Sequence, residues 1–298
     1  MLSSIPTWGQ ALTVLSAVTG ILSTTVSAAA VSKADTELSI RAAVPWQARH
    51  RLTSSQYQST FDSLVASGYR LTYVSGYTIN DDPRYAAIWE QTSGAAWVAR
   101  HGLTGAQYQT EFDKWTSQGY RPRLVNGYTV GGSARYAAIW DKSPAPGAWV
   151  ARHGLTSAQY QAEFDKWTGQ GYRPVHVSGY SDGGQARYAA IWEKTSGPAW
   201  AARHGLTSAQ YQSTANTLVG QGYRIAKVSG YTVNGVDFYA AIFDKAPTKG
   251  WVARHGLTSA QYQAEFDKWV GQGYKLTVVS GYTLSGSQDR YAAVWEQQ

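Results

Sequence analysis

The sequence predicts an α+β fold made of five tandem repeats, each about 51 residues long. Two observations predict it: the same phrase returns after each of five tryptophans, and within every unit a helical pattern gives way to a strand pattern. The opening tryptophans are Trp46, Trp97, Trp149, Trp200 and Trp251. We expect one helix and one antiparallel β-hairpin per unit, joined into a curved or closed antiparallel sheet (a half-barrel or ring) with helices on one face. Neither element buries its apolar face alone, so the units must stack.

The repeats form a single predicted domain over residues 46–298. Its units span residues 46–96, 97–148, 149–199, 200–250 and 251–298. The phrase ARHGLTSAQYQ is identical in units three, four and five. Such identity indicates that the units pack in equivalent environments.

In unit three, the capping residues and the apolar spacing predict the helix. Thr156-Ser157-Ala158-Gln159 has the Thr-x-x-Gln form of a capping box, which starts a helix. Tyr160, Phe164 and Trp167 follow at i, i+4 and i+7 and form one apolar stripe. Gly171 suits the left-handed position after a helix end.

Extended segments flank this helix. Residues 172–180 predict a strand, 181–184 a turn, and 187–193 the return strand of a hairpin. The segment 149–154 before the helix is a candidate third strand. A kelch propeller has a similar period. It is disfavoured because its blades are all strand, whereas the second quarter of each unit is helical.

Composition excludes several classes of protein. A hydrophobic fraction of 43% excludes a disordered chain. The absence of cysteine excludes a disulfide scaffold and any thiolate metal site. The net charge of +7 is mild and no Lys/Arg run occurs, which argues against a nucleic-acid partner.

The N-terminus predicts secretion. Residues 1–30 contain no charged side chain, and the run GQALTVLSAVTGILSTTVSAAA ends in small residues. This pattern indicates a secretory signal peptide over 1–30, cleaved after Ala28 or Ala30, followed by a leader or linker over 31–45. The alternative, a membrane anchor, is disfavoured by the Ser, Thr and Gly content. We expect a secreted, extracellular protein that has no membrane attachment once the signal is removed.

The hairpin tips vary most between units, at residues 80–83, 131–133, 182–185, 234–237 and 285–288. A constant frame with variable tips is typical of a binding scaffold, although any hairpin needs Gly, Asn and Asp there. Most aromatic residues should be core, but we expect one tyrosine per unit, beside the tip, to be exposed and to stack on a sugar or anchor a protein. The ligand-binding candidates are Tyr77, Tyr128, Tyr180, Tyr231, Tyr282, Arg84, Arg135, Arg187 and Arg290.

An Arg-His pair recurs in every unit. The pairs are Arg49-His50, Arg100-His101, Arg152-His153, Arg203-His204 and Arg254-His255. The favoured interpretation is structural: one of these cations pairs with the acid that ends the last strand of a neighbouring unit, because buried charge is generally paired. Those acids are Glu90, Asp141, Glu193, Asp244 and Glu296. Ligand contact, and a metal or anion held by five imidazoles, are the alternatives. We expect no metal site and no cofactor.

No catalytic motif is found: the sequence lacks Gly-x-Ser-x-Gly, Ser-x-x-Lys, His-Glu-x-x-His and a P-loop. A hydrolase site assembled from His153, Asp165 and a serine across units would need one singular unit, and none stands out. The sequence therefore favours a non-catalytic module.

The phrases W-x-A-R-H-G-L-T, Q-Y-Q, G-Y-R, V-S-G-Y and R-Y-A-A-I-W-E resemble the tryptophan-rich tandem repeats of secreted bacterial and fungal proteins. They are most similar to the N-terminal repeat region of fungal polyglycine hydrolases, over all 253 residues from Trp46 onward. The resemblance implies a secreted protein with repeats in an open, barrel-like arc. It transfers no catalytic residue, because the family's nucleophile belongs to a β-lactamase-like serine hydrolase domain whose Ser-x-x-Lys motif has no counterpart here.

Our leading hypothesis is a secreted, non-catalytic repeat module that binds an extracellular protein or a cell-wall polysaccharide through its hairpin tips. One alternative is a hydrolase-related protein that cleaves peptide or glycan. Another is a structural partner of a separate serine hydrolase.

Overall fold

The computed structural model describes residues 44–298. The predicted signal peptide, and the leader as far as residue 43, lie outside the described residues. Within the described part, no helix combines the length and apolar character needed to cross a membrane.

Every unit runs strand, helix, strand, strand. The first strands are β1 (Trp46–Thr53), β4 (Trp97–Leu103), β7 (Trp149–Leu155), β10 (Trp200–Thr207) and β13 (Trp251–Leu257). The helices are α1 (Ser54–Ala66), α2 (Gly105–Ser117), α3 (Ser157–Gly169), α4 (Ser208–Gly220) and α5 (Ser259–Gly271). The second strands are β2 (Arg70–Ile79), β5 (Arg121–Val130), β8 (Arg173–Asp182), β11 (Arg224–Val233) and β14 (Tyr274–Ser285). The third strands are β3 (Asp82–Glu90), β6 (Ser133–Asp141), β9 (Gln185–Glu193), β12 (Val236–Asp244) and β15 (Gln288–Gln297).

The helices begin where the capping boxes predict. In α3, the Thr156 hydroxyl accepts a hydrogen bond from the Gln159 backbone N–H at 3.2 Å, and the Gln159 side chain accepts one from the Thr156 N–H at 2.9 Å. All five helices carry this reciprocal box. Beyond α3, Gly171 has a φ of +83°, the left-handed conformation expected there. The predicted helix of unit three is confirmed.

The sheets are separate. Each unit forms its own three-stranded antiparallel sheet in the order first, third, second strand, as in β7-β9-β8. The segment that opens each unit is therefore the third strand of its sheet, and the predicted hairpin is confirmed. The expectation that hairpins join into one sheet is wrong, because the backbone of the second strands bonds to side chains of the next unit. The Gly127 N–H, for example, donates to Ser178 Oγ at 3.0 Å.

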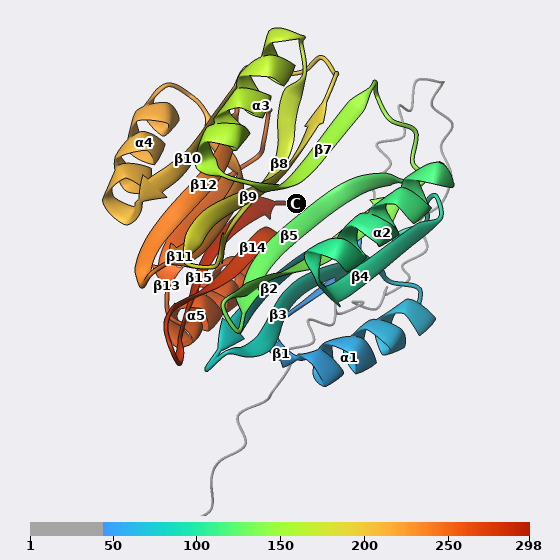
Figure 1. The fold of residues 1–298 in the computed structure, drawn as a ribbon. Helices are drawn as coiled ribbons and strands as arrows, with labels where there is room; N and C mark the ends of the chain where they lie inside the picture. Colours follow the sequence, from blue (N-terminus) through green and yellow to red (C-terminus); the bar gives the residue numbers. More distant parts are fainter. Residues whose placement is uncertain (1–43) are drawn as a thin grey trace, which may run out of the picture.

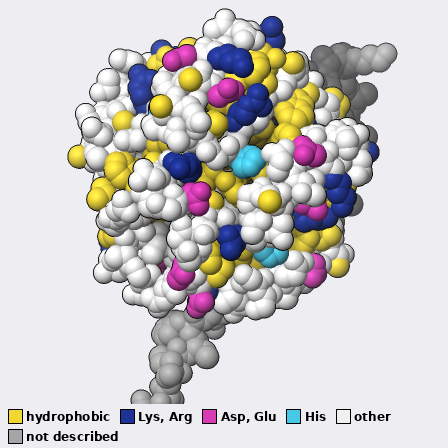
Figure 2. All heavy atoms as spheres, viewed as in Figure 1, with side chains coloured by type: hydrophobic (Ala, Val, Ile, Leu, Met, Phe, Trp, Pro, Cys, Tyr) yellow, Lys and Arg dark blue, Asp and Glu magenta, His cyan; other side chains and the backbone are white. Residues whose placement is uncertain are grey.

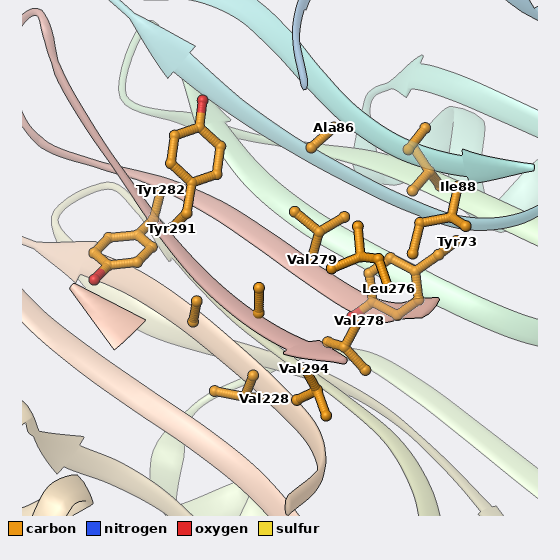
Figure 3. Packing of buried hydrophobic residues seen from close by; sticks show 14 of the residues in the cluster. Tyr73, Ala86, Ile88, Val228, Leu276, Val278, Val279, Tyr282, Tyr291 and Val294 are labelled. Carbon is orange, nitrogen blue, oxygen red and sulfur yellow. The ribbon is translucent and has the colours of Figure 1, made fainter. Parts of the chain in front are cut away.

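The five second strands lie side by side at the middle of the molecule, and the helices lie at its periphery (Figure 1). Each second strand contacts the second strands of the units before and after it, and β14 of unit five also contacts β2 of unit one. One buried cluster joins Tyr73 of unit one, Val228 of unit four and Val278 of unit five (Figure 3). Side-chain packing between separate sheets therefore holds the units together, as expected for stacked repeats.

Candidate ligand-binding cavity

A tyrosine from each second strand packs into a slot on the preceding unit. The Tyr180 ring lies so close to Gly127 that a Cβ on that glycine would be 2.3 Å from a ring carbon. Its hydroxyl bonds the Tyr136 hydroxyl of the preceding unit at 2.7 Å and accepts the Gly154 N–H of its own unit at 2.9 Å. Gly154 has a φ of +70° and lies in a β-bulge of β7. The glycine and the bulge together position the phenol.

The expectation that these tyrosines are exposed is wrong. Tyr77, Tyr128, Tyr180, Tyr231 and Tyr282 are all buried, with 2–4% of their surface accessible. The physical reason is the glycine that precedes each of them, because its bare backbone leaves room for the tyrosine of the next unit. Burial raises the pKa of these phenols well above the ordinary value, so they stay neutral. A role for these residues in binding stays a prediction.

The same strand segments surround a cavity at the hairpin end of the second strands, with a volume of about 220 Å³. We call it the tip-end cavity. It is lined by all five units, chiefly through their Gly-Tyr-Thr segments: Gly76, Tyr77, Thr78, Asn126, Gly127, Tyr128, Thr129, Gly179, Tyr180, Ser181, Gly230, Tyr231, Thr232, Asn234, Gly235, Gly281, Tyr282 and Thr283. None of these lining residues carries a charge. The cavity is therefore small, uncharged and walled mainly by small residues.

The arginines predicted beside the tips lie outside the tip-end cavity lining. Arg84, Arg135, Arg187 and Arg290 stand opposite the buried tyrosines in the register of the sheets. Each is partly buried and donates to the carbonyl oxygen of the residue before it. Each of these arginines is thus the cross-strand partner of a tyrosine, but only the tyrosine lines the tip-end cavity.

The repeated histidines lie at the unit interfaces. His153 meets Tyr108 and Tyr136 of the preceding unit edge-on, with ring centroids 4.6 and 5.3 Å away. The equivalents His50, His101, His204 and His255 make the same pair of contacts, and His50 does so across the junction of units five and one. Burial lowers the pKa of all five imidazoles, that of His50 to about 4. These histidines are therefore neutral at pH 7 and pack as aromatic rings.

The predicted pairing of Arg or His with the strand-end acids is wrong. Within their own units, Arg100, Arg152 and Arg254 pair with the helix residues Glu111, Glu163 and Glu265. Arg203 donates to the Ala202 carbonyl, and Arg49 to Gln47 and the Ala48 carbonyl. In units two, three and five, the helix that follows the Arg-His pair brings a closer carboxylate than the neighbouring strand does.

In units two, four and five, a cation at the start of the second strand bridges the strand-end acid of the next unit instead. Arg121 reaches Glu193 of the next unit at 2.6 Å, and both side chains are buried. Arg224 reaches Glu296 at 2.7 Å, and Lys275 of unit five reaches Glu90 of unit one at 2.6 Å. Figure 2 shows basic and acidic side chains interspersed over the viewed face, without a large area of one sign. Across residues 44–298, no group of three His, Cys, Asp or Glu side chains is placed to hold a metal ion.

The fold and its interfaces define a tandem-repeat protein whose units share one architecture. The family model described as "Polyglycine hydrolase-like, structural repeat" matches the chain five times, over residues 43–92, 94–143, 146–195, 197–246 and 248–298. The chain belongs to this family. The tryptophan-rich repeats recognised in the sequence are the units that the model matches.

Sequence reasoning missed the glycine and threonine walls of the tip-end cavity. The signal was present, because Gly-Tyr followed by Thr or Ser returns in all five units directly before the variable tips. The small residues of these segments surround the hollow together with the tyrosines, whereas the charged residues beside the tips do not.

Proposed function

We propose that this protein is a secreted, non-catalytic binding module whose tip-end cavity holds a narrow, uncharged, glycine-rich segment of an extracellular protein. One observation carries the proposal: all five units contribute small, uncharged residues to a single shared hollow. The uncharged N-terminal run of the sequence supports secretion.

The dimensions of the tip-end cavity favour a slender ligand. Its volume of about 220 Å³ is below the ~300–1,000 Å³ of typical small-molecule sites, so bulky side chains would not enter. Its polar groups are hydroxyls and amides, among them the Thr129 hydroxyl, which donates to the Ser181 carbonyl at 2.6 Å. Such groups exchange hydrogen bonds with peptide N–H and C=O groups without requiring a charged partner.

Two considerations favour peptide over polysaccharide as the ligand. The tyrosines that would stack on a sugar ring are buried between units, with 2–4% of their surface accessible. The family to which the chain belongs is described as polyglycine hydrolase-like, which points to glycine-rich peptide.

The test is calorimetric titration of the purified protein with end-blocked tetraglycine, chitotetraose and a β-glucan tetrasaccharide. Thr232, on the wall of the cavity, is replaced by tryptophan to fill the hollow. Thr217, which is exposed on α4 of the same unit, receives the same change as a matched control. Thermal melting of each variant monitors folding.

We expect tetraglycine to bind, T232W to weaken that binding at least tenfold, and T217W to leave it within twofold. Tighter binding of either oligosaccharide would overturn the peptide assignment. Tetraglycine binding that is insensitive to a folded T232W protein would place the site elsewhere and overturn the cavity assignment.

A further inference from the structure

One position of the second strands breaks the repeat. It lies just before the valine that all five units share, and it carries Tyr73, Leu124, His176, Lys227 and Val278. The five positions are structurally equivalent, because each pairs with the same isoleucine or valine position of its third strand. Two units thus place an aliphatic side chain where the others carry a phenol, an imidazole and an amine. Packing alone does not require these polar groups.

Lys227 reaches from unit four towards unit one. Its Nζ lies 5.9 Å from the centre of the Tyr73 ring, and these two units are not successive in the chain. His176 is buried, and its Nε2 lies 2.9 Å from the Val125 carbonyl oxygen, to which it donates. The Lys227 amine has no carboxylate within 4.0 Å among the described residues.

Lys227 also lines a hollow of about 370 Å³ at the strand-start end, away from the hairpin tips. We call it the strand-start hollow. Its charged residues are Arg173, Arg224 and Lys227 against Asp244 and Glu296. Arg224 binds both carboxylates, each at 2.7 Å. In the described part of the chain, Arg173 forms no ion pair either, so two cations of the strand-start hollow have no carboxylate within 4.0 Å.

We propose that the strand-start hollow binds a small carboxylate through Lys227 and Arg173. A partly buried cation without a counter-charge is unfavourable, and a bound anion offsets that cost. The neighbouring Asp244 and Glu296 favour a monoanion over a doubly charged phosphate, because each added negative charge is repelled by them.

Burial lowers the pKa of the Lys227 amine, with Glu296 and Asp244 opposing the effect and Arg224 and Arg123 adding to it. A carboxylate beside the amine would favour its charged form.

The test is titration of the full chain with sodium acetate, with N-acetyl-triglycine bearing a free carboxylate, and with inorganic phosphate, in a low-salt buffer free of other oxyanions. Lys227→Met and Arg173→Met each remove one cation. Lys245→Met removes the same charge from an exposed side chain of the same unit as Lys227 and is the matched control. Lys227→Met should fold, because units two and five already carry Leu124 and Val278 at this position.

We expect a carboxylate to bind, K227M and R173M each to weaken it at least tenfold, and K245M to leave it within twofold. Preference for acetate would identify a free carboxylate as the ligand, and preference for N-acetyl-triglycine a peptide terminus. Equal losses in K227M and K245M would reduce the effect to net charge and overturn the proposal. Tighter phosphate binding, or no carboxylate binding by the unmodified protein at 50-fold molar excess, would also overturn it.

Discussion

A single methyl group placed at the interface of units three and four tests how the repeats are held together. In Gly179→Ala, the new Cβ would lie 2.3 Å from one carbon of the Tyr231 ring and 2.4 Å from another. Ordinary carbon–carbon contacts are about 3.5–4.0 Å, so the ring must move by more than about 1 Å. Tyr231 is buried, and its hydroxyl bonds the Tyr188 hydroxyl at 2.6 Å, which opposes that movement.

The cost follows from these contacts. Overpacking of a core costs about 1–3 kcal/mol, and breaking the hydroxyl pair adds about 1 kcal/mol. We therefore expect Gly179→Ala to lower the free energy of unfolding by about 2–4 kcal/mol. For a domain of this size, that loss corresponds to a fall in Tm of roughly 5–15 °C.

The assay is thermal and denaturant unfolding followed by circular dichroism. Gly169→Ala is the matched control, because Gly169 is the last residue of α3 and a Cβ there would meet nothing within 4 Å. This control should leave stability unchanged or raise it by up to about 1 kcal/mol, since alanine favours helix. A Gly179→Ala protein as stable as the control would refute the account of the tyrosine slot.

Three further predictions concern the same framework. Tyr188→Phe breaks the buried hydroxyl pair with Tyr231 and should lower the free energy of unfolding, measured with denaturant, by about 0.5–1.5 kcal/mol. The Tyr172 hydroxyl forms no hydrogen bond in the described structure, so Tyr172→Phe should cost almost nothing. Equal costs would contradict the pairing. Arg121→Ala removes the 2.6 Å partner of the buried Glu193 carboxylate, which keeps only Arg123 at 3.9 Å, and should cost about 2–3 kcal/mol. The more exposed Arg123→Ala should cost under about 1 kcal/mol, and the reverse ranking would disprove the account. Burial lowers the pKa of His176 to about 4. As the pH falls, the unfolded chain therefore binds a proton at His176 before the folded protein does. The stability that the neutral, buried His176 contributes is complete above about pH 6.5 and is lost as the pH falls towards 4. In His176→Leu, the fall in the free energy of unfolding between pH 7 and pH 5 should therefore be about 2 kcal/mol smaller than in the unmodified protein. An unchanged dependence of stability on pH would exclude this role for His176.

The local elements were predictable because short-range chemistry determines them. The Thr156–Gln159 capping box and the glycine after the helix defined α3 to within a residue or two, and the turn residues defined the hairpin. The separation of the sheets was not predictable in the same way. It depends on Ser178 accepting a backbone N–H from the preceding unit, a contact between residues 51 positions apart.

The binding residues were harder to predict because burial depends on the neighbouring unit. Tyr180 beside a variable tip has the pattern of an exposed anchor, yet Gly127 of the preceding unit accommodates its ring. The His153 contacts likewise involve two tyrosines of another unit. At the strand-start end, the sequence shows that Lys227 departs from the repeat. The register of β11 with β12 was also needed, because it shows that Lys227 occupies the position equivalent to Tyr73, Leu124, His176 and Val278.

The most direct test of the proposed function is nuclear magnetic resonance titration of the amide-labelled protein with end-blocked tetraglycine. The five lining glycines that precede the buried tyrosines provide one signal per unit: Gly76, Gly127, Gly179, Gly230 and Gly281. The helix residues Gly169 and Gly220 serve as internal references. We predict saturable shifts at the lining glycines while the reference amides stay unmoved. Saturable shifts confined to the helices or the outer strands, with the lining glycines unmoved, would contradict binding in the tip-end cavity.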